Sequence, residues 1–211
     1  MDSPFDAPGS PSRPAAGSAP PTPVLVPGRP FTPAELQAMA IDGVLRRLVG
    51  DSYAPAPAPV TAELRAAALA TTYDPRLRHR TVVGRQSAAW IYGCAPEPPV
   101  PVLLVPSPRR LSSARKARGV LVHEVWLGDF DVIELGPLRI TSPLRTAVDM
   151  AMHGETPLAS LVLRRLLGRS GLGLTPSLVS RALEALPRQP RKQRGREVLA
   201  RLLRESPKSA A

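Results

Sequence analysis

Two motifs decide the fold of this chain: Val83-Gly-Arg-Gln-Ser-Ala-Ala-Trp-Ile-Tyr-Gly93 and Leu138-Arg-Ile-Thr-Ser-Pro-Leu-Arg-Thr-Ala-Val-Asp149. In the first motif, an apolar pair and a glycine precede small residues, which predicts a short strand leading into a closely packed helix. In the second, an apolar strand pattern ends at Ser142-Pro143. Serine is a favoured N-cap and proline a favoured first helical residue, so a helix is expected to begin there.

The segments around these motifs indicate a sheet enclosed by helices. Strands are expected at residues 82–83, 100–105, 120–127, 131–135 and 138–141, with Gly136-Pro137 as the turn between the last two. Helices are expected at residues 61–72 and 87–92 before the main strands, and at 158–167, 175–186 and 193–205 after them. This order predicts an α+β fold: a small, mostly antiparallel sheet flanked by helices, with a helical C-terminus.

The segment before the sheet has the pattern of a helix-turn-helix. Thr32-Pro-Ala-Glu35 is a capping box, so a short helix is expected to end near Ala40. Val44–Val49 then predicts a second helix, with Arg46 and Arg47 outside its apolar stripe. The module is degenerate, because no first helix precedes it and Gly50-Asp-Ser52 stands where a basic wing would lie. A helical hairpin that binds no DNA is the alternative.

Composition divides the rest of the chain. Nine of the first thirty residues are proline, so residues 1–28 are expected to form a disordered tail. The domains are then predicted as 29–58 for the helix-turn-helix-like hairpin and linker, 59–172 for the central α+β domain, and 173–211 for a basic helical segment. The N-terminus is acidic and lacks an apolar core, and no long apolar run occurs elsewhere, so neither a signal peptide nor a membrane span is expected. Cys94 is the only cysteine, which excludes a disulfide framework and fits a cytoplasmic protein.

The charge points to a polyanionic or acidic partner. The formal net charge is +11, and 25 of the 28 basic residues are arginine. Codon bias in a GC-rich genome explains arginine over lysine, but not the excess of positive charge. Two runs are poor in acids: a loop with Arg109, Arg110, Arg115 and Lys116, and residues 188–204. Such runs position a nucleic acid by its phosphates and do not specify its bases.

Together the two motifs resemble the middle domain of AbiEi-type antitoxins and regulators of bacterial abortive-infection (type IV toxin–antitoxin) systems, over roughly residues 31–204. The resemblance implies a preceding winged helix-turn-helix with Val44–Val49 as its recognition helix. It also implies promoter DNA and a cognate nucleotidyltransferase-like toxin as partners. The positions that match the family motifs are Ser87, Trp90, Gly93, Thr141, Ser142, Arg145, Thr146 and Asp149. Longer relatives continue into an endonuclease-like domain that would begin where this chain ends, so nuclease activity is not expected.

No catalytic residue, metal site or cofactor is predicted. Arg145 and Asp149 stand one helical turn apart, where they could orient a phosphate or hold a general base. Such a pair is more often a structural support worth a few tenths of a kcal/mol. The three histidines, His79, His123 and His153, have no metal-ligand spacing, and no glycine-rich phosphate loop occurs.

The sequence therefore favours a non-enzymatic AbiEi-like antitoxin or DNA-binding transcriptional regulator. The DNA-binding candidates are Arg46, Arg47, Arg109, Arg110, Arg115 and Lys116. Two alternatives stay open: a protein–protein interaction module that has lost DNA binding, and a nucleic-acid-processing enzyme or subunit. The operator, the toxin and the oligomeric state do not follow from the sequence.

Overall fold

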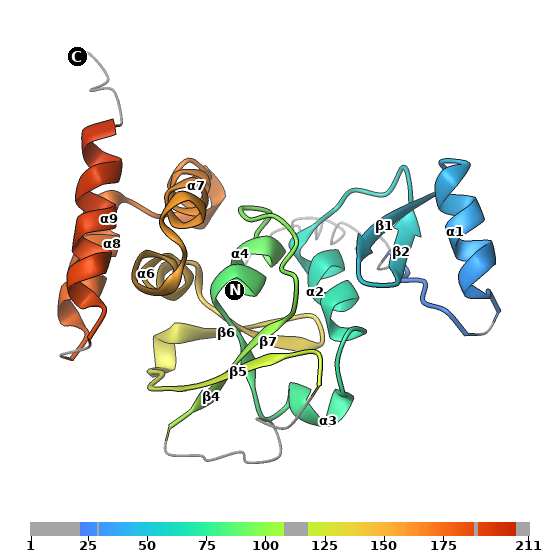
Figure 1. Ribbon diagram of the computed structural model, residues 1–211, viewed down its shortest axis with the longest axis horizontal. Helices are drawn as coiled ribbons and strands as arrows, with labels where there is room; N and C mark the ends of the chain where they lie inside the picture. Colours follow the sequence, from blue (N-terminus) through green and yellow to red (C-terminus); the bar gives the residue numbers. More distant parts are fainter. Residues whose placement is uncertain (1–21, 29, 108–117, 188–189, 206–211) are drawn as a thin grey trace, which may run out of the picture.

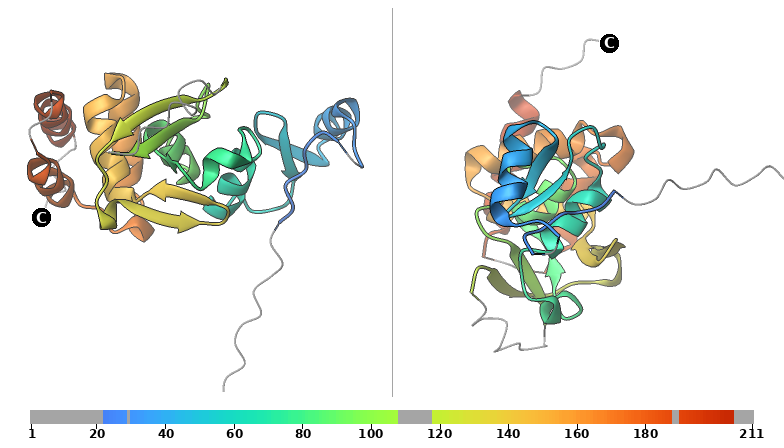
Figure 2. Two further views of the ribbon diagram at one scale, coloured as in Figure 1. Left: turned by 90° about the horizontal axis from the view of Figure 1, so that it is seen from below. Right: turned by 90° about the vertical axis from the view of Figure 1, so that its right-hand side faces the viewer.

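The computed structural model describes residues 22–28, 30–107, 118–187 and 190–205 and shows an elongated α+β molecule (Figure 1). A helix and a two-stranded hairpin lie at one end, a five-stranded sheet with its covering helices in the middle, and a group of helices at the other end. The left view of Figure 2 shows the same three parts along the long axis, and the right view looks down that axis from the end that carries α1. The predicted α+β class is confirmed.

The central sheet is mixed rather than mostly antiparallel. Its strands are β3 (Val82–Val83), β4 (Val102–Pro106), β5 (Leu121–Val125), β6 (Val132–Leu135) and β7 (Leu138–Thr141), in the order β5-β4-β3-β7-β6. The pairs β3–β4 and β6–β7 are antiparallel, whereas β4–β5 and β3–β7 are parallel. The short β3 stands in the centre, so the first motif supplies the middle of the sheet.

The helices that follow β3 and β7 form the core on one face of the sheet. These are α4 (Arg85–Ile91) and α6 (Pro143–His153), and α2 (Ala62–Ala70) packs beside α4. Val83, Leu103 and Ile140 point from the sheet into this core. Because alternate strand residues face opposite ways, Val82 and Leu104 lie on the other face, where a smaller apolar cluster forms.

The C-terminal helices belong to the same core as the sheet. They are α7 (Thr156–Leu167), α8 (Pro176–Ala185) and α9 (Lys192–Glu205), and all three pack around α6 (Figure 1). Val179, Leu183 and Leu202 are buried against it. This part of the protein also contains two short 3₁₀ turns, η1 (Asp129–Asp131) and η2 (Ser170–Leu172), and the one-turn helix α3 (Pro75–Arg78).

The N-terminal unit consists of α1 (Pro33–Ile41), β1 (Leu45–Val49) and β2 (Ser52–Pro55). Leu45 and Tyr53 pack against Leu36 of α1 in a cluster of three buried residues. Leu48 and Val49 belong instead to the main core. The hairpin is therefore a layer between α1 and the rest of the protein.

The predicted disordered tail ends too late. Leu25 pairs with Tyr53 through two backbone hydrogen bonds of 2.8 Å, and Val24 packs against the main core. Residues 22–28 thus belong to the ordered part of the chain, because they add an extended segment to the edge of the hairpin. Among the described residues, no helix has the length and apolar character needed to cross a membrane.

Candidate functional site

The predicted recognition helix is a β-strand, and this prediction was wrong. Leu45, Leu48 and Val49 are buried and Arg46 and Arg47 exposed, a spacing that also fits a helix. In the structure, the pairing of β1 with β2 shifts between Arg47 and Val49. Leu45 faces α1 and Leu48 faces the main core, because residues three apart on a strand point to opposite sides. The bulge then lets Val49 face the main core together with its neighbour Leu48.

Arg46 and Arg47 lie on the exposed edges of the hairpin and make local contacts. Arg46 donates a hydrogen bond of 2.7 Å to the carbonyl of Ala56. Arg47 donates one of 2.7 Å to the carbonyl of Gly50, and its guanidinium lies 3.8 Å from a carboxylate oxygen of Glu97. The charge of Arg47 is thus partly balanced, whereas Arg46 forms no ion pair with an acid in the described part of the chain.

The other predicted basic clusters have different outcomes. Arg109, Arg110, Arg115 and Lys116 lie outside the described residues, between β4 and β5. In the C-terminal run, Lys192 and Arg196 both form ion pairs with Glu184, and Arg201 pairs with Glu205. The hydrogen bonds from Arg196 lower the pKa of Glu184 to about 2, with Lys192 adding to the effect. Much of the positive charge at α9 is therefore balanced by acids within the fold.

Residues of the first motif fasten α4 to its surroundings. The hydroxyl of Ser87 is fully buried and accepts a hydrogen bond of 2.9 Å from the backbone N–H of Val102. Trp90 is buried in the core, and Gly93 follows the helix with a φ of +71°. Ser87 thus joins the helix to β4, and Gly93 permits the chain to turn in a conformation that side chains disfavour.

Residues of the second motif form a connected hydrogen-bond network where β7 becomes α6. Ser142 caps the helix by accepting from the N–H of Arg145 at 3.3 Å. The hydroxyls of Thr141 and Thr146 lie 2.7 Å apart. The carbonyl of Thr141 also accepts a hydrogen bond of 2.7 Å from the hydroxyl of Tyr92 at the end of α4. This network ties the two motifs to each other.

Arg145 is the centre of a buried charge cluster. Its side chain donates to Asp149 at 3.0 Å, to Asp131 at 2.7 Å and to the carbonyl of Trp126 at 3.0 Å. Arg145 is 5% exposed and Asp149 2% exposed. The predicted pair is therefore present, but it is a buried junction between α6 and the β5–β6 connection rather than a weak surface support. Asp131 lies fourteen residues before Arg145, and no spacing rule in the sequence pairs the two.

Further basic groups surround Asp149. Burial raises the pKa of Asp149, whereas Arg145 and then Arg85 act to lower it. One carboxylate oxygen of Asp149 and the Nε of Arg85 are buried without a hydrogen-bond partner among the described residues. Arg85 also has a φ of +53°, a left-handed conformation that costs a non-glycine residue about 1–2 kcal/mol. Nothing in the residue type or the spacing of Arg85 marks this strain in the sequence.

His153, the last residue of α6, is close to several of the same basic side chains, and its pKa makes folding stability depend on pH. Burial, with Arg85 and Arg191 next in importance, lowers its pKa to about 4. The unfolded chain, with an ordinary histidine pKa, binds a proton between about pH 6.5 and 4 that the folded chain does not. Folding stability should therefore fall as the pH drops through this window.

We expect the loss due to His153 to be about 1 kcal/mol between pH 7 and pH 5, after discounting for its partial exposure. Urea unfolding of the wild type and of His153→Gln at both pH values measures it. The variant should lose less stability on acidification than the wild type. An identical loss in the two proteins would contradict the assignment.

Among the described residues, no group of three or more His, Cys, Asp or Glu side chains is placed to hold a metal ion.

The comparisons with known proteins leave the family open. No protein-family model matches this chain, and no curated protein matches it. Among solved structures, the chain is similar to the Rv2827c protein from Mycobacterium tuberculosis. The sequence identity is 19%, the match covers 79% of this chain and 68% of that one, and the TM-score is 0.35.

Proposed function

We propose that this protein is a non-enzymatic, DNA-binding regulator of the AbiEi-like kind, with the β1–β2 hairpin as its DNA-contacting wing. The observation that carries the proposal is the N-terminal unit: a capped helix followed directly by an antiparallel hairpin, with an apolar cluster of its own. A helix followed by a hairpin is the second half of a winged helix. The unit stands at one end of the molecule, with α1 on its outer side (Figure 1).

The charges of the hairpin support contact with phosphates. Arg46 and Arg47 are exposed on β1, and arginine is the side chain best suited to paired hydrogen bonds with phosphate oxygens. α1 itself carries no basic residue. The proposal therefore assigns the phosphate contacts to β1, where the sequence had suggested a recognition helix.

A non-enzymatic role agrees with the surroundings of the acidic residue in the second motif. Asp149 is buried inside the fold and bonded to Arg145, so a substrate on the surface does not reach it. The geometry favours a structural role for this pair. We expect no hydrolysis of DNA or RNA that depends on Asp149.

The proposal predicts that the double variant Arg46→Ala/Arg47→Ala weakens DNA binding without unfolding the protein. Each phosphate contact that is lost should reduce the slope of log K against log salt by about 0.9. Fluorescence anisotropy titrations with the protein's own promoter duplex, at several salt concentrations, measure that slope. The matched control is Arg181→Ala/Arg204→Ala, which removes two exposed arginines from α8 and α9 at the opposite end of the molecule (Figure 1).

Equal slopes for the wild type and the hairpin variant would refute the assigned interface. A reduced slope in the control as well would show that DNA is bound by the overall positive charge rather than by the hairpin.

A second candidate function, binding of a protein partner, is favoured by two exposed aromatic residues. Trp126 is 59% exposed and Phe130 95% exposed, both on the connection between β5 and β6. Large exposed aromatic residues are enriched at protein interfaces.

A nucleotidyltransferase-like protein encoded beside this chain is the partner to test. Trp126→Ser/Phe130→Ser should weaken co-purification with it at least tenfold while DNA binding is retained. Unchanged co-purification would reject this surface.

A further inference from the structure

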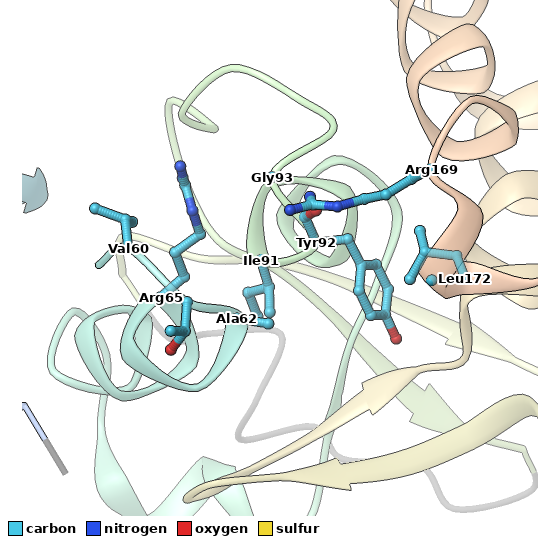
Figure 3. A pocket seen from close by; sticks show the side chains of 10 residues that line it. Val60, Ala62, Arg65, Ile91, Tyr92, Gly93, Arg169 and Leu172 are labelled. Carbon is cyan, nitrogen blue, oxygen red and sulfur yellow. The ribbon is translucent and has the colours of Figure 1, made fainter. Parts of the chain in front are cut away.

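A pocket of about 340 Å³ opens between α2, α4 and η2, away from the hairpin and from the Arg145 cluster. Figure 3 shows Arg65 extending from α2 and Arg169, the second residue after α7, reaching across from the other side of the turn at Gly93. We call this the Arg65–Arg169 pocket. It is lined by Val60, Thr61, Ala62, Arg65, Ile91, Tyr92, Gly93, Arg169, Gly171 and Leu172.

Both arginines are held in place by contacts that leave hydrogen-bond donors available. The guanidinium of Arg65 stacks over the ring of Trp90, 4.9 Å from its centroid. Arg169 donates a hydrogen bond to the carbonyl of Tyr92 at the end of α4, and its side chain also interacts with the thiol of Cys94. A guanidinium group carries five N–H donors. Each side chain is thus oriented beforehand for a ligand that accepts several hydrogen bonds.

Gly93 makes room for this arrangement. A Cβ atom at this position would lie 2.7 Å from a terminal nitrogen of Arg169. The φ of +71° at Gly93 also disfavours any side chain there. The glycine of the first motif therefore serves the close approach of Arg169 as well as the turn.

The pocket has an excess of positive charge. No acidic residue lines it, and neither Arg65 nor Arg169 forms an ion pair in the described part of the chain. Burial, followed by the nearby charge of Arg169, lowers the pKa of Arg65. The first turn of the nine-residue helix α2 also lines the pocket, and helix N-termini favour anions. Three positive features therefore converge on one hollow.

We propose that the Arg65–Arg169 pocket binds the phosphate group of a small organic phosphate of nucleoside-monophosphate size. A terminal phosphate offers three oxygens to the two guanidinium groups, a geometry that arginine recognises in pairs of parallel hydrogen bonds. Val60, Ile91 and Leu172 supply an apolar wall for the organic part. The volume is within the range of small-molecule sites.

The test is isothermal titration calorimetry of the full chain at constant ionic strength and pH 7.5, with adenosine 5′-monophosphate, inorganic phosphate and adenosine as probes. We expect saturable binding of the monophosphate to one site, and no binding of adenosine. Arg65→Gln and Arg169→Gln should each weaken binding of the monophosphate at least tenfold, since each removes charge-assisted hydrogen bonds. Arg181→Gln, which changes an exposed arginine on α8, is the matched control and should bind like the wild type.

Inorganic phosphate separates the two possible sources of the group. Equal affinity for phosphate and monophosphate assigns the site to the free anion, and tighter binding of the monophosphate assigns it to an organic phosphate. The proposal is overturned if none of the phosphate probes saturates below about 10 mM, or if Arg169→Gln binds as the wild type does. Arg169 is exposed and outside every core cluster of the described residues, so this variant folds even if Arg65→Gln does not.

Discussion

Replacing Arg145 by methionine is expected to lower the free energy of unfolding by about 3–5 kcal/mol, the usual cost of leaving a buried charge without its partner. The change removes the donor that Asp149 and Asp131 share and the hydrogen bond to the carbonyl of Trp126. Urea unfolding measures the effect as a shift of the midpoint with an unchanged slope.

The double variant Arg145→Met/Asp149→Leu provides the control. Replacing both members of a buried pair by apolar residues is often nearly neutral, so the double variant should be more stable than Arg145→Met alone. A loss below about 1 kcal/mol for the single variant would show that the pair is the weak support expected for an exposed i, i+4 contact.

The second large effect is expected from Leu36→Ala in α1. Truncating a fully buried leucine costs about 2–5 kcal/mol, and Leu36 is one of only three buried residues in the cluster of the N-terminal unit. We expect local unfolding of α1 and the outer face of the hairpin. Hydrogen exchange of the backbone amides of residues 33–41 should accelerate by roughly 30-fold to several thousand-fold.

Amides of α6 are the internal reference for this experiment, because α6 lies in the main core. Their exchange should stay unchanged in Leu36→Ala. Equal acceleration in α1 and α6 would show that the N-terminal unit and the main core unfold together, which contradicts the separate cluster. DNA binding should fall in this variant, since the hairpin loses the helix that supports it.

The sequence predicted well those elements whose ends have a local chemical signal. Thr32 and Glu35 form the capping box that begins α1, and Thr61 and Ser142 cap α2 and α6. These caps need only residues three apart, so the pattern is readable in the chain. The bounds of β7, Leu138–Thr141, were likewise predicted from its apolar alternation and the turn before it.

Predictions from the sequence failed where one spacing of apolar residues fits both a helix and a strand, or where a strand pairs with a segment far away in the chain. The spacing of Leu45 and Leu48 fits one face of a helix, but on the strand β1 the two residues face opposite sides, Leu45 toward α1 and Leu48 toward the main core. The parallel pairing of β3 with β7 joins segments more than fifty residues apart and has no local signal. Leu25 belongs to a proline-rich segment, yet it pairs with Tyr53.

The candidate sites were only partly visible for the same reason. The sequence singled out Arg145, Asp149 and Gly93, which belong to the two motifs. Asp131, Arg85 and Arg169 enter through the tertiary structure, which brings separate segments beside α6 and α4. The Arg145 cluster and the Arg65–Arg169 pocket both bring together residues that are far apart in the sequence. No rule of sequence spacing links such residues.

The most direct test of the proposed function is the affinity of the wild-type protein for its own promoter duplex and for a shuffled duplex of equal length and composition. Anisotropy titrations at two salt concentrations measure both. A DNA-binding regulator should prefer its promoter by about 10³-fold or more near physiological salt. Part of that preference should persist when salt weakens the phosphate contacts. Equal, weak and wholly salt-dependent binding to both duplexes would contradict the proposal.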